Sequence, residues 1–146
     1  MTAPRLSAIV FAGIILENQH GNILLQRRAN TGFADGLWSL PGGVVDRGEL
    51  LVQAAAREAH EELDVDVDLQ DLRTAHVLNK VTETGVPIVG WYFHTRRWAG
   101  ELKNREPDRC SEIGWADPRA LDPVLTEDTD HTALQAWLDG TPSTFS

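Results

Sequence analysis

Residues 49–63, with the sequence ELLVQAAAREAHEEL, constrain the fold of this chain more than any other stretch. The run of alanines at its centre is strongly helix-forming. At about 100° per residue, the apolar side chains fall on one side of such a helix: Val52, Ala55, Ala56, Ala59 and Leu63. Because a continuous apolar face has to be buried, we expect a helix at about 49–63 that packs against a β-sheet.

The same helix gathers negative charge on a different sector, roughly a third of a turn from its apolar face. Glu58, Glu61 and Glu62 lie within one turn of each other, where like charges cost about 0.2–0.5 kcal/mol per pair. Arg57 precedes Glu61 by one helical turn and can pair with it. Glu49, in the first turn, can reach back to Arg57. A solvated helix face is the common role of such a cluster, so we expect the acids to be grouped but not buried.

The segment that leads into this helix, LPGGVVDRGE at 40–49, is rich in glycine. Glycine lets a backbone approach a ligand closely, and the start of a helix presents free N–H groups. We therefore expect Gly42 and Gly43 to lie where the chain can approach a ligand closely.

Upstream of this segment, β-branched residues and turn signals predict two strands. The strands are expected at 7–17 and 22–28, joined around His20 as a hairpin. Residues 29–43 contain too many Gly, Asn and Asp residues for a regular element. They are expected to form a loop with a short extended segment at 38–40.

Downstream, alternating polar and apolar residues predict further strands at 64–69 and within 89–98, with a turn at 82–85. A short strand is expected at 111–117. The spacing of apolar residues at 132–140 predicts a final helix that ends at glycine, after which the chain is expected to fray.

This order of elements predicts an α+β fold built as an α/β/α sandwich, with helices over a mixed β-sheet. The chain is expected to form one domain, 1–146. Cys110 is the only cysteine, so no intrachain disulfide forms and a buried apolar role is expected. The apolar segment after Arg5 is too short to cross a bilayer and leads into a turn, so we expect no membrane association and a cytoplasmic location.

The formal net charge of -9 and the pI near 4.9 restrict the partners of the chain. Proteins that bind the phosphate backbone of a nucleic acid carry a basic surface, so no stable DNA or RNA complex is expected. Small phosphorylated substrates are compatible with this charge, because a divalent cation reverses the local sign of a carboxylate-rich pocket.

The residues that carry the most specific signal share the spacing G-x5-E-x7-R-E-x-x-E-E: Gly43, Glu49, Arg57, Glu58, Glu61 and Glu62. In this spacing the chain resembles the Nudix hydrolases. The predicted hairpin before it and the WAGE…REPDRC…GWAD stretch after it resemble small MutT-like members that act on nucleotides. The resemblance implies the Nudix fold, with a mixed sheet, a Nudix-box loop and helix, and a C-terminal helix.

The chain departs from the family pattern at two positions. Asp64 stands where the pattern has glycine, so the end of the helix is expected to differ, because Asp tolerates a left-handed conformation less well. Ala59 stands where the family often has a larger aliphatic residue, which changes packing and not chemistry.

The resemblance implies that Mg²⁺ assists hydrolysis of a phosphoanhydride, with Mn²⁺ as a possible substitute. Hard oxygen ligands suit such cations, which substrate phosphates also coordinate. Glu58 and Glu62 are implied as the main ligands, with the carbonyl of Gly42, and with Glu61 acting directly or through water. One of these glutamates would deprotonate the attacking water.

The resemblance also implies roles for residues around these ligands. Arg57 and Glu49 would orient the glutamates. Glu106, in a later loop, is the candidate for an additional ligand or base, with Glu112 as its rival.

Other residues are candidates for binding the nucleotide. Arg28 would contact substrate phosphate, unless it is an ordinary surface arginine at a strand end. Trp38 would stack on a base, unless it packs in the core. Asp128 and Asp130, before the last helix, would read a base edge, although a helix-capping role is favoured.

The sequence therefore predicts an Mg²⁺-dependent hydrolase of a nucleoside triphosphate, including modified or damaged ones, that yields a monophosphate and pyrophosphate. The alternatives are a hydrolase of ADP-ribose or another nucleoside diphosphate derivative, a non-catalytic nucleotide sensor and an RNA-end hydrolase. The expected partner is a small nucleotide, and the chain is expected to be a monomer or homodimer.

Overall fold

The computed structural model describes residues 6–146, so Arg5, ahead of the first apolar segment, lies outside the described residues. The strands are β1 (Ile9–Leu16), β2 (Ile23–Arg28), β3 (Trp38–Ser39), β4 (Gly42–Val44), β5 (Arg73–Val81), β6 (Pro87–Thr95), β7 (Cys110–Ala116) and β8 (Ser143–Phe145). The helices are α1 (Leu51–Leu63) and α2 (Asp128–Leu138), with short 3-10 turns η1 (Leu69–Asp71) and η2 (Pro118–Ala120).

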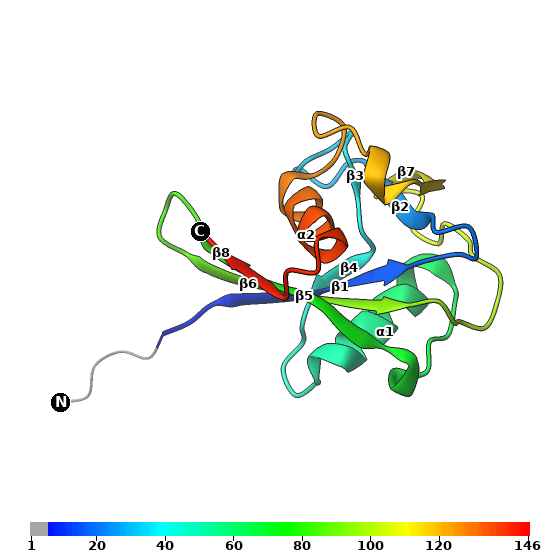
Figure 1. The fold of residues 1–146 in the computed structure, drawn as a ribbon, viewed down its shortest axis with the longest axis horizontal. Helices are drawn as coiled ribbons and strands as arrows, with labels where there is room; N and C mark the ends of the chain where they lie inside the picture. The colour runs from blue at the N-terminus through cyan, green and yellow to red at the C-terminus, as the bar shows by residue number, and fades with distance from the viewer. Residues whose placement is uncertain (1–5) are drawn as a thin grey trace.

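The strands form two sheets, which Figure 1 shows together with the helices. A mixed sheet has the order β4-β1-β6-β5-β8, and a smaller one has the order β3-β2-β7. In the larger sheet β1 lies parallel to β6 and antiparallel to β4, while β5 and β6 form a hairpin. The predicted turn at 82–85 closes this hairpin, with the Val86 N–H bonded to the Thr82 hydroxyl.

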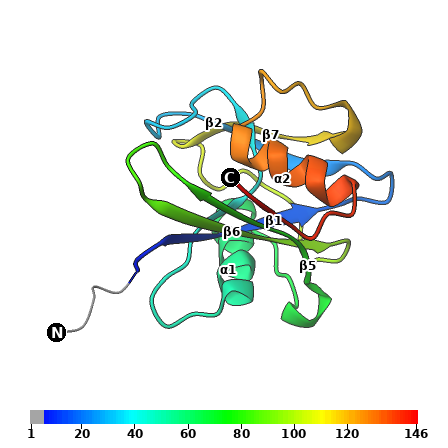
Figure 2. The ribbon, with the colours of Figure 1, turned by 60° about the vertical axis from the view of Figure 1, so that its left-hand side comes forward.

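The two helices cover opposite faces of the larger sheet, as Figures 1 and 2 show. Successive residues of a strand point to opposite faces. In β1, Ile14 and Leu16 join the core under α1, whereas Ile15 joins the core under α2. In β6, Phe93 and Tyr92 divide in the same way. The α+β sandwich predicted from the sequence is therefore confirmed.

Helix α1 begins at Leu51, two residues later than predicted, and ends at Leu63 as predicted. Its buried residues are Ala54, Ala55, Ala59 and Leu63. Asp64 takes the left-handed conformation that the family pattern gives to glycine, with φ of 61°. Its carboxylate lies 3.2 Å from Arg105 Nη1 and 3.9 Å from Lys103 Nζ. These cations help to stabilise an aspartate in a conformation that costs it energy.

Two sequence predictions about pairing are wrong. Strands β1 and β2 follow one another but belong to different sheets, and a single bridge between Glu17 and Ile23 replaces the predicted hairpin. Residues 64–69 form no strand beyond an isolated bridge at Asp66. Their alternation reflects Val65 and Val67, which are buried in the core under α1, because burial and strand pairing leave the same pattern.

The C-terminal region also differs from its prediction. Helix α2 begins at Asp128, four residues early, because Glu127 caps it by accepting a hydrogen bond from the Asp130 N–H at 2.9 Å. The predicted capping role of Asp128 and Asp130 is therefore wrong. The last residues do not fray, since β8 pairs with β5 and the Thr144 hydroxyl lies 2.8 Å from His76 Nε2. Within residues 6–146, no helix combines the length and apolar character needed to span a membrane.

Candidate active site

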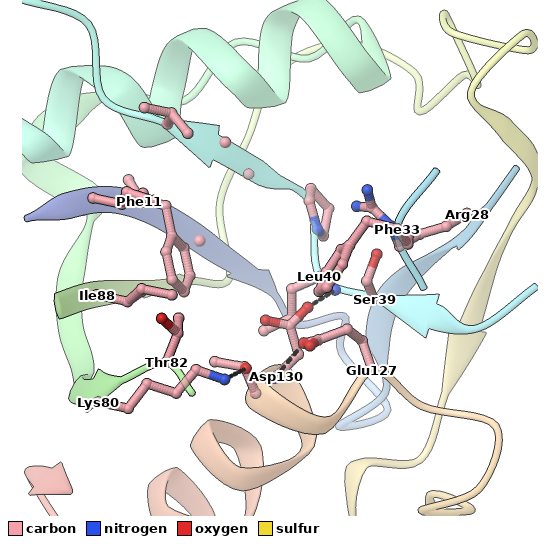
Figure 3. Close-up of a pocket in the computed structure, with 18 residues that line it drawn as sticks. Phe11, Arg28, Phe33, Ser39, Leu40, Lys80, Thr82, Ile88, Glu127 and Asp130 are labelled. Carbon is pink, nitrogen blue, oxygen red and sulfur yellow. Dashed lines mark hydrogen bonds between the residues drawn. The ribbon is translucent and has the colours of Figure 1, made fainter. Parts of the chain in front are cut away.

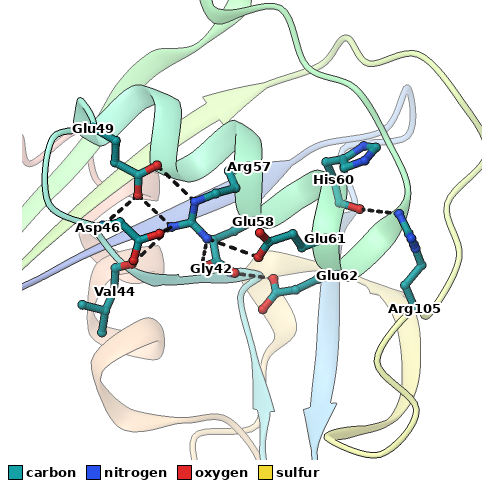
Figure 4. A network of polar contacts seen from close by, with 10 residues as sticks. All are labelled: Gly42, Val44, Asp46, Glu49, Arg57, Glu58, His60, Glu61, Glu62 and Arg105. Atoms are coloured by element: carbon teal, nitrogen blue, oxygen red, sulfur yellow. Dashed lines mark hydrogen bonds and ion pairs between the residues drawn. The ribbon is translucent and has the colours of Figure 1, made fainter.

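Arg57 is the centre of a polar network on α1 (Figure 4). Its Nη2 and Nε lie 2.7 Å and 3.1 Å from the two carboxylate oxygens of Glu49. Its Nη1 donates to Glu58 at 3.0 Å and to Glu61 at 3.2 Å. Hydrogen bonds from Arg57 hold the pKa of Glu49 below its ordinary value. The predicted contact between Glu49 and Arg57 is therefore confirmed, and the guanidinium fixes the positions of three acids.

Glu62 lies apart from that network and is the most deeply placed of the helix acids. Its Oε2 accepts a hydrogen bond from the Gly42 N–H at 3.0 Å. Burial raises the pKa of Glu62 well above its ordinary value, and the charges of Glu58 and Glu106 raise it further. Glu62 is half-buried, so it is more shielded from solvent than exposed Glu61. The segment after β6 runs along this end of α1, where the Arg105 N–H bonds to the Glu62 carbonyl at 2.9 Å.

The glycines of β4 bring the backbone close to these carboxylates. A Cβ on Gly43 would overlap the carboxylate of Glu58, so no other residue fits this position without moving the acid. Gly42 has φ of 151°, and a Cβ there would overlap the carbonyl of Ala12 in β1. Gly42 contacts Glu62 through its N–H, and metal binding by the Gly42 carbonyl stays a prediction. Glycine is thus required at position 42 by the backbone of β1, and at position 43 it leaves the Glu58 carboxylate in its place.

The acids fit a divalent cation by their chemistry. Burial raises the pKa of Glu58, and this effect exceeds the opposing effect of Arg57. Glu62 has one N–H partner and several negative neighbours, so a cation would relieve a repulsion that the protein leaves in place. Within residues 6–146, no three His, Cys, Asp or Glu side chains are already placed around a common metal position. Arg57 holds Glu58 and Glu61, so these side chains would turn from the guanidinium to bind a metal.

Of the two candidates for an additional acid, the structure places Glu106 near the helix and Glu112 elsewhere. The charge of Glu106 contributes to the raised pKa of both Glu58 and Glu62. Glu112 is exposed on β7, paired in register with Arg27 of β2. The role of Glu106 stays a prediction, but it is the acid within electrostatic reach.

A cavity of about 390 Å³ lies on the opposite face of β1 from α1 (Figure 3). Phe11 and Ile88 form apolar parts of its wall. None of the α1 glutamates lines it, but Gly42 and Gly43 do, and the same two glycines contact Glu62 and Glu58 on their other side. The cavity and the acids are therefore separated only by strand β4 at the edge of the sheet, over which an elongated ligand can pass.

Arg28 lines this cavity, as predicted for a substrate-binding arginine. Its Nε donates to the Phe33 carbonyl at 2.7 Å, and its Nη2 donates to the Thr31 hydroxyl at 3.1 Å. The guanidinium carbon also lies 5.4 Å from the centre of the Phe33 ring. These contacts position the charge at the cavity, and phosphate binding by Arg28 stays a prediction.

Asp130 is buried at the base of the cavity with both carboxylate oxygens bonded. Oδ2 accepts from the Leu40 N–H and Oδ1 accepts from the Tyr92 hydroxyl, each at 2.9 Å. Burial raises the pKa of Asp130 to about 7, with a further contribution from the charge of Glu127. Asp130 therefore links α2 to the sheet, and base reading by its carboxylate stays a prediction.

Two other predicted residues lie away from the cavity. Trp38 packs against the core under α2 and lines a smaller pocket with Trp115, and not the larger cavity. The structure therefore shows the packing role that was the alternative for Trp38, and base stacking by Trp38 stays a prediction. Cys110 is buried, and burial raises the pKa of its thiol, which fits the expected inert role.

Sequence reasoning missed two residues that line the cavity, Lys80 and Glu127. Lys80 is a polar residue in a stretch where polar and apolar residues alternate. Glu127 stands just before two other acids, ahead of a predicted helix. Neither residue has a local signal that distinguishes it from surface charge, because the cavity joins segments far apart in the chain.

A mixed sheet between two helices, with an acidic cluster on one helix beside a glycine strand, defines the class of protein, and the comparison with family models agrees. The NUDIX domain model matches residues 8–138. The chain therefore belongs to the NUDIX family and is a Nudix hydrolase. Members of this family generally use divalent metal ions.

Curated relatives are named as MutT-like proteins and pyrophosphohydrolases. A MutT-like protein of Streptomyces ambofaciens is 29% identical over 126 residues, covering 86% of this chain and 74% of that protein. An 8-oxo-dGTP diphosphatase of Haemophilus influenzae is 36% identical over 115 residues, covering 77% and 78%. An RNA pyrophosphohydrolase of Novosphingobium aromaticivorans is 29% identical over 130 residues, covering 77% and 80%.

Solved structures show the same fold. A MutT NUDIX hydrolase from Burkholderia pseudomallei superposes with a TM-score of 0.78 at 28% identity, covering 88% of this chain and 97% of that one. The ORF135 protein of E. coli also gives a TM-score of 0.78, at 24% identity, with 94% of each chain covered. These matches confirm the MutT-like Nudix fold predicted from the sequence.

Proposed function

We propose that this chain hydrolyses a nucleoside triphosphate between its α and β phosphates, with Mg²⁺, to give a nucleoside monophosphate and pyrophosphate. The observation that carries the proposal is the place of β4, with the cavity on one side and the carboxylates on the other. A nucleoside in the cavity would extend its phosphates across Gly42 and Gly43 to the acids. The relatives named 8-oxo-dGTP diphosphatase support a nucleotide of this kind, including damaged ones.

In this reaction the residues of the chain have separate tasks. Glu58 and Glu62, with Glu61, would hold the cation, which when bound neutralises phosphate charge and activates water. One of the two acids with a raised pKa, Glu58 or Glu62, would accept the proton from the attacking water. Arg57 and Glu49 would keep the acids in position, and Glu106 would add a ligand or base.

Binding of the substrate phosphates would fall to groups between the cavity and the helix. Arg28 already lies at the cavity with its guanidinium fixed by the loop, so it would meet a phosphate without a large loss of side-chain entropy. Gly43 leaves room for the phosphate chain to pass close to the backbone.

A second candidate is the 5′ end of RNA, because relatives of this chain are named RNA pyrophosphohydrolase. The same triphosphate chemistry would serve, with the first nucleotide in the cavity. The net charge of -9 argues against it, since an RNA chain needs positive charge along its path.

The test is a panel of nucleoside triphosphates, ADP-ribose and 5′-triphosphorylated RNA, each assayed with Mg²⁺ and with Mn²⁺, with the products identified by chromatography. We expect monophosphate and pyrophosphate from a nucleoside triphosphate. AMP and ribose 5-phosphate from ADP-ribose, with triphosphates untouched, would favour the runner-up. Tight nucleotide binding without any product would favour a sensor.

A further inference from the structure

The cavity contains a lysine with no carboxylate partner. Lys80, at the end of β5, lines the cavity and donates one hydrogen bond to the Thr129 hydroxyl at 2.7 Å. Within residues 6–146, none of the ion pairs involves Lys80. An ammonium group has three donors, so two are left for an occupant of the cavity.

Glu127 offers the opposite chemistry in the same cavity. Its Oε2 accepts from the Asp130 N–H at 2.9 Å, and this bond caps α2. Its Oε1 has no hydrogen bond to any residue from 6 to 146. No fully buried side-chain oxygen in that range lacks a partner, so Oε1 faces accessible space, which at Glu127 is the cavity.

Both groups meet at the first turn of α2, Lys80 from β5 and Glu127 as the residue that caps the helix. Lys80 contacts Thr129, Glu127 caps the same turn, and Asp130 lies between them in Figure 3. Each oxygen of Asp130 already accepts one hydrogen bond from the protein, whereas Glu127 has one oxygen without any such bond. An occupant therefore meets one group that only donates beside one that only accepts, under an apolar wall that includes Phe11.

We propose that Lys80 and Glu127 make this cavity select nucleotide bases that present a carbonyl oxygen beside a ring N–H. Guanine, hypoxanthine, uracil and thymine have this edge, with the carbonyl toward Lys80 and the N–H toward Glu127. Adenine and cytosine reverse it, placing an amino group against the ammonium and a lone pair against the carboxylate. This inference rests on the proposed function, because it assigns the base-binding part of the same site.

The test compares five triphosphates, GTP, ITP, UTP, ATP and CTP, on the wild type, Lys80→Met and Lys103→Met. Met keeps the length of the lysine without its charge, and Lys103 is a matched control on the surface beside α1, outside the cavity. Steady-state kinetics give kcat and KM for each nucleotide. Competition calorimetry on the wild type measures base preference without turnover, and thermal unfolding confirms that each variant folds.

For the wild type we expect kcat/KM to favour GTP, ITP and UTP over ATP and CTP by about tenfold or more. Lys80→Met should raise KM for the three favoured nucleotides by about tenfold and leave ATP and CTP within about twofold. Lys103→Met should match the wild type on all five.

Equal kcat/KM for all five on the wild type, or an equal loss on all five in Lys80→Met, would overturn the base-reading role and leave the hydrolase intact. Absence of turnover on all five would count against the proposed function, and the calorimetric ranking would then decide the base preference alone. If Lys80→Met does not fold, the wild-type ranking decides the same question.

Discussion

Two carboxylates on opposite sides of the sheet, half-buried Glu62 and buried Asp130, differ in how the protein satisfies them. Burial raises the pKa of both. Asp130 accepts hydrogen bonds from Leu40 and Tyr92, one on each oxygen. Glu62 accepts one hydrogen bond, from the Gly42 N–H, and is repelled by the charge of Glu58. A buried acid with a donor on each oxygen is part of the structure, whereas a half-buried acid with repelling neighbours is part of a site for positive charge.

The largest effect is expected on turnover. Glu62→Gln removes the charge but hardly any volume, so it should lower kcat by about a hundredfold or more while the chain still folds. The measurement is release of pyrophosphate, with Glu101→Gln as a control because Glu101 is exposed and lies outside the network. Near-wild-type turnover in Glu62→Gln would remove this residue from the mechanism.

The next effect is on stability, and it concerns the other acid. Asp130→Ala leaves the Leu40 N–H and the Tyr92 hydroxyl without partners, which should lower the free energy of unfolding by about 3 kcal/mol. Asp130→Asn keeps an acceptor and a donor and should cost about 1 kcal/mol. Urea denaturation measures both. An alanine variant as stable as the asparagine variant would show that these hydrogen bonds do not hold α2 to the sheet.

The pH dependence of stability should separate the two acids. An acid with a raised pKa binds its proton more tightly in the folded state, so the free energy of unfolding falls as pH rises from the unfolded pKa through the folded one. For Asp130 this range runs from the ordinary value of 3.8 to about 7. Each group contributes a slope of at most about 1.4 kcal/mol per pH unit.

Urea denaturation from pH 4 to 8, with and without Mg²⁺, measures how the free energy of unfolding changes with pH. We expect Glu62→Gln to remove part of the slope, and Mg²⁺ to remove the same part in the wild type. Asp130→Asn should remove the other part whether or not Mg²⁺ is present. A slope that neither variant changes would contradict the assignment.

The smallest effect is expected from the arginine that organises the acids. Arg57→Lys keeps the charge but loses the planar fork that contacts Glu49, Glu58 and Glu61 together. We expect kcat to fall by about threefold to tenfold, with little change in unfolding free energy because the contacts are partly exposed. Steady-state kinetics measure kcat. An unchanged kcat would mean that the planar guanidinium is not needed to position the acids.

Features set by local spacing could be predicted from the sequence. The helix at α1, the contact of Arg57 with Glu49 and the strands β6 and β7 all follow from periodicity, turn residues or residues a few positions apart, whereas β5 was not predicted. The family pattern gave the class of enzyme through the same local spacing.

Features set by packing between distant segments could not be predicted. The segment around Arg105 lies against the Glu62 end of α1, and no local pattern connects the two. The division of β1 and β2 between two sheets, and the pairing of β8 with β5, are also choices of partner that alternation does not specify. The same holds for Lys80 and Glu127, which meet only because β5 and α2 border one cavity.

The most direct test of the central claim, that the α1 carboxylates form a site for a divalent cation, is thermal unfolding of the nucleotide-free chain with increasing Mg²⁺. A ligand that binds only the folded state raises its stability in proportion to the logarithm of its concentration above Kd. We predict that the unfolding temperature rises for the wild type and for Glu101→Gln, and stays nearly constant for Glu62→Gln. An equal rise in Glu62→Gln and the wild type would contradict the claim.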